Sequence, residues 1–230
     1  FDRFLTEEQF GWRIAENCPE DIRILDTEDL HFLRNTRQVA YKNNEKVTLK
    51  HLASDLAKRE IASIYRCDLT LIISKYEMKL LKKTFKIHKS LLHYVPFLLP
   101  KITMETLRSY PSFQNRNHFI SIGNFKHEPN WNSVQYLKTV IWPLIHEKLP
   151  ESELHVYGAY ATEKVQQLHN KKEGFLIKGW AENTEVVFTN VRVCLAPLQF
   201  GAGLKGKLID AMKFGTPSVT TSIGAEAMHD

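Results

Sequence analysis

The sequence predicts an α/β protein built on parallel sheets. Short apolar segments alternate with amphipathic ones, and the run 68–74 (DLTLIIS) is continuously apolar, as in strands that are buried on both faces. A chain of 230 residues with 43% hydrophobic residues is long enough to bury a substantial core in one or two domains. Alternation of this kind indicates helices layered on parallel sheets.

Charge is distributed unevenly along the chain and predicts a domain boundary. Residues 1–116 contain 20 Lys and Arg against 15 Asp and Glu, whereas residues 117–230 contain 11 of each. The net charge of +5 therefore lies entirely in the first half. This change in composition predicts one domain over 1–112 and a second over 113–230.

The first half reads as alternating helices and strands. Apolar spacing and turn residues predict, in order, a helix over 6–17 opened by a capping box of Thr6 and Gln9, a strand over 21–25, an acidic turn over 26–34 (DTEDLHFLR), a long helix over 48–65, a strand over 68–74, a basic helix over 75–85 and a strand over 92–97.

The cysteines and the hydropathy pattern indicate the cellular compartment of the protein. Cys18, Cys67 and Cys194 are widely spaced and form no metal-binding pattern. Cys67 and Cys194 lie in apolar strand contexts, so we interpret these two as small buried hydrophobic residues and expect a reducing compartment. No segment has the roughly 18 apolar residues of a membrane span, and the N-terminus lacks the layout of a secretory signal. We expect a soluble, cytoplasmic protein.

The segment 197–217 (PLQFGAGLKGKLIDAMKFGTP) is a candidate phosphate-binding site. It joins an apolar strand over 191–196 to a helix over 204–214, and Gly201, Gly203 and Gly206 have the spacing G-x-G-x-x-G. Free N–H groups and the positive end of a helix dipole attract phosphate at such a junction. The alternative is a tight turn that needs glycine for its conformation.

Two lysines strengthen the phosphate interpretation. Lys205 and Lys207 lie at the start of the helix, where cations oppose the dipole, so a nearby anion is expected; the alternative is that both are solvated. No Asp-x-Asp pair suited to a divalent ion is present, and we expect no metal cofactor.

The order of strand, glycine-rich turn, basic residue, Asp-Ala-Met, Gly-Thr-Pro and short strand resembles the donor half of the GT-B glycosyltransferases, closest to the group 1, or family 4-like, branch. The resemblance covers roughly 110 residues in order and spacing. It includes the segments 118–137 (HFISIGNFKHEPNWNSVQYL), 153–158 (ELHVYG) and 174–183 (GFLIKGWAEN). It implies two Rossmann-like domains, both incomplete here: the C-terminal part of an acceptor-side domain over 1–112, and a donor domain lacking its last elements over 113–230.

The resemblance implies transfer of a sugar from a UDP- or GDP-linked donor to a hydroxyl of a glycan, lipid or other acceptor. It also implies that the anomeric configuration of the sugar is retained and that no cofactor is needed. Lys205 and Lys207 would stabilise the departing diphosphate. Ala202 occupies the position of a glutamate in relatives, although a neighbouring branch also carries Phe-Gly-Ala-Gly. The alternative is therefore a non-catalytic GT-B module used for nucleotide binding or protein interaction.

The same resemblance assigns donor-binding residues. Gly123, Asn124 and Phe125 follow the first donor-domain strand, in a loop that approaches the diphosphate or is simply a polar turn. Asp210 would bind the ribose and Glu226 the sugar. Lys178, Gly179 and Trp180 would frame the base, unless Trp180 is a core residue. Gly201 and Gly203 complete the set.

On the acceptor side, His31 is the candidate group that deprotonates or positions the attacking hydroxyl, with an exposed loop histidine as the alternative. The segment 75–89 contains six lysines and one glutamate, which suits peripheral contact with an anionic membrane or a phosphorylated acceptor, or a solvated face. No motif for nucleic-acid binding is present, and we expect no such partner.

Overall fold

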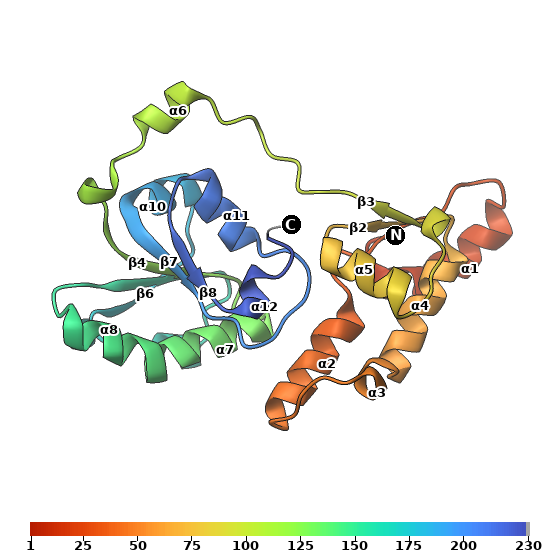
Figure 1. Ribbon diagram of the computed structural model, residues 1–230, viewed down its shortest axis with the longest axis horizontal. Coiled ribbons are helices and arrows are strands. Elements are labelled where there is room, and N and C mark those ends of the chain that lie inside the picture. Colours follow the sequence, from red (N-terminus) through yellow and green to blue (C-terminus); the bar gives the residue numbers. More distant parts are fainter. Residues whose placement is uncertain (229–230) are drawn as a thin grey trace. The chain divides into compact units, whose positions relative to one another are not determined.

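The computed structural model describes residues 1–228 and divides the chain into two α/β units (Figure 1). Unit 1 comprises residues 1–99, 200–204 and the described residues after 225; unit 2 comprises residues 100–199 and 205–225. This division differs from the expected boundary at 112/113. Residues 100–112 belong to unit 2. Residues 200–204 and the described residues after 225 belong to unit 1, and no local pattern in the sequence indicates this assignment.

Unit 1 is built on a parallel three-stranded sheet in the order β1 (Ile24–Asp26), β2 (Leu69–Ile72) and β3 (Leu92–Tyr94). Its helices are α1 (Arg3–Asn17), α2 (His31–Lys42), α3 (Leu49–Leu52), α4 (Asp55–Arg66) and α5 (Lys75–Lys83), with a 3-10 turn η1 (Lys89–Leu91). Leu25, Ile72 and Leu92 form a common core with apolar side chains of α2, α4 and α5.

Two helices of unit 1 differ from the sequence-based expectation. Helix α1 begins at Arg3, and its N-cap residue Asp2 makes no side-chain hydrogen bond, so Thr6 lies within the helix instead of capping it. The segment expected to be one helix over 48–65 forms two, because α3 ends at Leu52 and the Ser54 side chain accepts a hydrogen bond from the Ala57 N–H to start α4.

Unit 2 is built on a parallel five-stranded sheet in the order β6-β5-β4-β7-β8. The strands are β4 (Asn117–Ile122), β5 (Leu154–Tyr157), β6 (Phe175–Gly179), β7 (Val191–Ala196) and β8 (Ser218–Thr220). The chain runs outward from β4 to β6 and then returns to place β7 on the other side of β4. This reversal creates a switch point between β4 and β7, where the loops leave the sheet in opposite directions and ligands bind in α/β proteins.

Helices cover both faces of this sheet (Figure 1). One face packs on α7 (Glu128–Tyr136), the π-helical turn η3 (Leu137–Ile141) and α8 (Trp142–Lys148), and the other on α10 (Thr184–Asn190) and α11 (Gly206–Lys213). Phe119 faces the first layer and Ile120 the second, as alternation along a strand requires. The remaining short elements are α6 (Met104–Ser109), η2 (Phe113–Asn115), α9 (Glu163–Gln166), η4 (Lys171–Glu173) and α12 (Ser222–Ala225).

Within residues 1–228, no helix combines the length and apolar character needed to cross a membrane. Helix α5 has an apolar side, but this side packs within unit 1: Leu81 is buried in the core and Leu80 packs against it, as does Phe85 just after the helix. The exposed surface of the segment 75–89 is therefore dominated by its lysines.

Candidate active site

The carboxyl ends of β4, β5 and β6 lie side by side in unit 2. The Gly123 N–H donates to the Tyr157 carbonyl at 3.1 Å, and the Gly158 N–H donates to the Gly179 carbonyl at 2.7 Å. A Cβ atom on Gly158 would lie 2.1 Å from the Gly123 carbonyl oxygen, so only glycine permits this approach. The loop containing Gly123 and the loop that leads to Trp180 therefore lie on either side of the segment containing Gly158.

A lysine and two asparagines connect the two sides of the switch point. Lys207, in the first turn of α11 after β7, donates from Nζ to Asn130 Oδ1 at 2.8 Å. Asn130, on α7 after β4, donates from Nδ2 to the Asn124 carbonyl at 3.0 Å. The structure thus places Lys207 against the loop of Gly123 and Asn124.

Lys207 is a cation in a poorly solvated position. Burial lowers its pKa to about 8, because desolvation disfavours the ammonium form. Its hydrogen-bond partner, Asn130, is a neutral amide, and among residues 1–228 no carboxylate forms an ion pair with it. A desolvated cation without a neutralising carboxylate is suited to an anionic ligand.

Two other predicted residues lie on the same helix. Lys205 occupies the N-cap position of α11 and is only 7% exposed, so it is a buried residue and not a solvated one. Asp210 lies one turn beyond Lys207, and burial raises its pKa. The start of α11 therefore carries three of the predicted site residues.

The predicted base-binding loop presents an exposed ring. Trp180 is 69% exposed and is therefore not a core residue. Gly179 adopts a positive φ of 75° with open space where a side chain would be, and Lys178 is exposed beside it. Phe125, in contrast, packs its ring into the core of unit 2.

The first part of the glycine-rich turn belongs to unit 1. The Gly203 N–H donates to Glu77 Oε1 at 2.8 Å, which differs from the phosphate contact expected for it. Gly203 has a φ of 64°, and a Cβ atom there would lie 2.8 Å from the Cβ of Asp29. The carbonyl of Gly201 accepts a 2.7 Å hydrogen bond from Arg37. Gly203 thus serves close packing in unit 1, and Gly201 provides a hydrogen-bond acceptor there.

Glu226 is held by an arginine of unit 1. Arg37 donates to both of its carboxylate oxygens at 2.7 Å, and both side chains are largely buried. The guanidinium also lies over the ring of Tyr76, 5.2 Å from its centroid. The carboxylate expected to bind sugar is therefore already paired in this structure.

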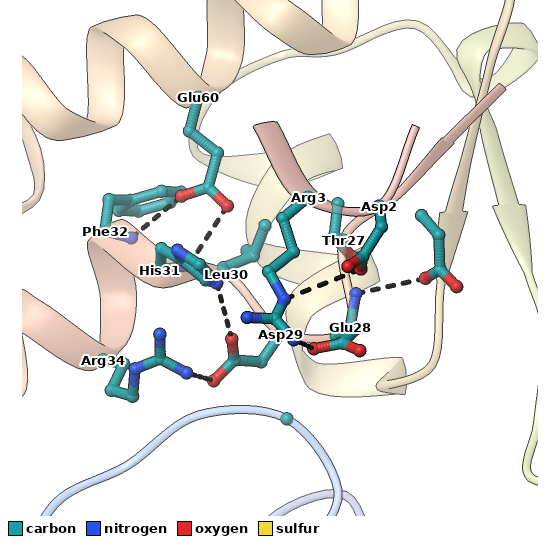
Figure 2. A network of polar contacts seen from close by, with 12 residues as sticks. Asp2, Arg3, Thr27, Glu28, Asp29, Leu30, His31, Phe32, Arg34 and Glu60 are labelled. Carbon is teal, nitrogen blue, oxygen red and sulfur yellow. Dashed lines mark hydrogen bonds and ion pairs between the residues drawn. The ribbon is translucent and has the colours of Figure 1, made fainter. Parts of the chain in front are cut away.

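His31 lies in a dense polar network at the start of α2 (Figure 2). Its Nε2 is 3.5 Å from Asp29 Oδ1, and the other oxygen of Asp29 accepts a hydrogen bond from Arg34. The imidazole is only 13% exposed, so His31 is not an exposed loop residue. Burial, reinforced by the charge of Arg34, lowers the pKa of His31 and keeps the ring neutral at pH 7.

A buried glutamate that we did not predict accepts a hydrogen bond from the backbone of His31. Glu60 on α4 accepts hydrogen bonds from the His31 N–H at 3.1 Å and the Phe32 N–H at 2.8 Å, which satisfies two free donors at the start of α2 (Figure 2). Burial raises the pKa of Glu60 to about 8. The sequence signal was a carboxylate between Ala57 and Ile64, on the apolar side of its helix. No comparable signal marked Asn130.

Comparison with solved structures gives the fold. The chain is similar to S. aureus TarM, solved with fondaparinux, alpha-GlcNAc-glycerol and UDP (12% identity, TM-score 0.67, 96% of this chain and 41% of that one). It is also similar to the pneumococcal O-GlcNAc transferase GtfA, solved with UDP and GlcNAc (15%, 0.59, 93% and 40%). A third is WaaG, a glycosyltransferase involved in lipopolysaccharide biosynthesis (14%, 0.56, 96% and 65%).

These likenesses show a GT-B fold, and this chain spans about two fifths of the length of the first two structures. No curated protein sequence matches the chain. Residues 116–230, which include the whole sheet of unit 2 and the start of α11, match the family described as glycosyl transferases group 1. The chain belongs to this glycosyltransferase family.

Proposed function

We propose that the protein transfers a sugar from a nucleoside diphosphate to a hydroxyl acceptor, with retention and without a metal ion at the site of transfer. The observation that carries the proposal is the position of Lys207. It is a desolvated cation at the start of α11, hydrogen-bonded to Asn130 across the switch point of a parallel sheet.

The chemistry requires positive charge near the diphosphate. As the glycosidic bond breaks, negative charge grows on the leaving diphosphate, and cations fixed in advance lower the barrier. Lys207 would take this role and Lys205 would assist it. Asp210 would accept hydrogen bonds from the ribose, and the exposed ring of Trp180 would stack on the base beside Gly179.

The acceptor hydroxyl requires a group that takes or orients its proton. His31 is neutral at pH 7 because of burial, and Asp29 beside Nε2 would stabilise the imidazolium that forms on proton transfer. We propose His31 as this group.

The similar structures favour a uridine donor. TarM and GtfA were both solved with UDP, and we extend that base to this chain in preference to GDP. The acceptor is proposed to be a glycan or another hydroxyl compound. The exposed lysines of the segment 75–89 would contact an anionic membrane or a phosphorylated acceptor through charge, which salt-sensitive sedimentation with anionic vesicles would check.

Binding of UDP tests the donor site directly. The expected result is that UDP raises the melting temperature and that Lys207→Met removes most of the rise. Lys213→Met, in the last turn of the same helix, is the matched control and should retain it. If neither UDP nor GDP shifts the melting temperature of the unmodified protein, the proposed donor site is wrong. Release of UDP from UDP-sugars would then establish turnover.

A further inference from the structure

Three potential metal ligands meet at the amino-terminal end of the sheet in unit 2. His118 is at the start of β4, Glu153 immediately precedes β5, and His155 is in β5. One ligand atom of each lies within 4.8 Å of the others. The two strands are direct neighbours, with Phe119 opposite Leu154, so the sheet itself holds the three residues together.

The side chains converge on a single carboxylate oxygen. Glu153 Oε2 is 2.6 Å from His155 Nε2 and 3.7 Å from His118 Nδ1. The two imidazoles are stacked, with centroids 4.6 Å apart and planes 27° from parallel. In tetrahedral zinc sites, metal–ligand bonds of about 2.0–2.1 Å place neighbouring ligand atoms about 3.3 Å apart. The two observed spacings lie on either side of that value.

The chemistry of the three side chains suits a transition-metal ion, because each offers a nitrogen or oxygen atom that can serve as a ligand. Two imidazoles and one carboxylate are a common ligand set for Zn²⁺, and the partial exposure of Glu153 and His118 leaves room for water as a fourth ligand.

We propose that His118, Glu153 and His155 bind a divalent transition-metal ion of the Zn²⁺ class, which links the amino-terminal ends of β4 and β5. The site is separate from the donor site, because Gly123 and Lys207 lie at the carboxyl ends of the strands. The proposed ion is therefore structural and takes no part in sugar transfer. The positive charge of Lys178, which also acts on His155, opposes the binding of a metal cation at this site.

Metal-free protein titrated with Zn²⁺ in the absence of nucleotide tests the site. We expect one Zn²⁺ per chain by calorimetry, a higher melting temperature, and at least about tenfold weaker binding in Glu153→Gln and in His155→Ala. His93→Ala, an exposed histidine of unit 1, is the matched control and should bind as the unmodified protein does. Co²⁺ should give a visible ligand-field spectrum without a thiolate charge-transfer band, which separates this site from the cysteines.

Two results would overturn the proposal: no stoichiometric binding by the unmodified protein, or binding unchanged in both variants. Glu153 is partly exposed, so Glu153→Gln should fold, and its circular dichroism checks this. The shift produced by UDP should persist in Glu153→Gln. Loss of metal binding with the UDP shift intact, and the reverse in Lys207→Met, would distinguish this site from the proposed donor site.

Discussion

Lys207 donates a 2.8 Å hydrogen bond to Asn130, a residue 77 positions earlier in the chain. The bond joins α11, which follows β7, to α7, which follows β4. It therefore spans the point at which the order of strands reverses. In the proposed donor complex, phosphate would supply the negative charge that this desolvated ammonium group lacks, and Asn130 would hold the ammonium in position.

Replacement of Lys207 should weaken nucleotide binding and leave the fold intact. A hydrogen bond to a charged group contributes about 1.5–3 kcal/mol, so Lys207→Met should bind UDP about ten- to a hundredfold more weakly. Asn130→Ala should have a smaller effect, because it frees the ammonium without removing it. Calorimetric titration measures both, and equal affinity in Lys207→Met and the unmodified protein would contradict the assignment.

Nucleotide binding should take up a proton near pH 8. Burial holds the pKa of Lys207 at about 8 in the free protein, and a bound diphosphate would raise it. Above pH 8 the free lysine is largely neutral, so UDP affinity should fall as pH rises from 7 to 9. Titrations in buffers with different ionisation enthalpies measure the uptake. Lys207→Met should show neither the uptake nor this pH dependence.

Glu60 should make the protein less stable as pH rises. Its pKa is raised from 4.5 to about 8, so the folded protein holds a proton that the unfolded chain releases. This contribution to stability is complete below pH 4.5 and is lost as pH rises to 8, with a slope of up to about 1.4 kcal/mol per pH unit. Chemical unfolding from pH 5 to 8 measures it, and Glu60→Gln should remove that part of the slope. A parallel pH profile in the variant would refute this account.

Removing one residue of the Arg37–Glu226 ion pair should lower the free energy of unfolding. Removing one partner of a buried ion pair leaves an uncompensated charge and costs about 3–5 kcal/mol. We expect Arg37→Met to lower the free energy of unfolding by this amount, and the double variant Arg37→Met/Glu226→Leu to recover part of it. Denaturant unfolding checks both. No recovery in the double variant would show that Arg37 stabilises mainly through Gly201 or Tyr76.

Replacement of His31 should slow transfer without affecting donor binding. A general base contributes about 10²–10⁴-fold to the rate, so His31→Gln should lower kcat by that order while the UDP-induced shift in melting temperature persists. Because burial lowers the pKa of His31, the activity of the unmodified protein should fall only at pH values below the ordinary pKa of an imidazole. His93→Gln is the control. An unchanged kcat in His31→Gln would remove His31 from the mechanism.

A local pattern and the family resemblance together were sufficient for the strands that carry the site. The apolar run at 191–196 coincides with β7, and the segments 118–137 and 153–158, which the resemblance assigned to the donor domain, contain most of β4 and all of β5. A strand that is buried on both faces requires a continuous apolar run, which a sequence displays directly. The boundary between α3 and α4 was missed because Ser54 caps a helix in the middle of an otherwise continuous helical pattern.

The glycine-rich segment shows the limit of local patterns. Its glycines and lysines indicated a turn before a helix, and α11 does begin at Gly206. The partner of Gly203 was not indicated, because Glu77 is 126 residues away and reaches it only through packing within unit 1. The same packing buries Ala202 in the core of unit 1, where a glutamate would be a buried carboxylate.

The sequence by itself therefore determined the α/β class, the parallel strands, the family and the set of polar residues at the start of α11, because these follow from local periodicity and motif spacing. The tertiary structure decided which partners the candidate site residues have. Glu226 forms an ion pair with Arg37, Lys207 donates a hydrogen bond to the neutral side chain of Asn130, and Glu60 accepts a hydrogen bond from the His31 N–H. These outcomes depend on desolvation and on contacts between distant segments, and neither is encoded in the spacing of neighbouring residues.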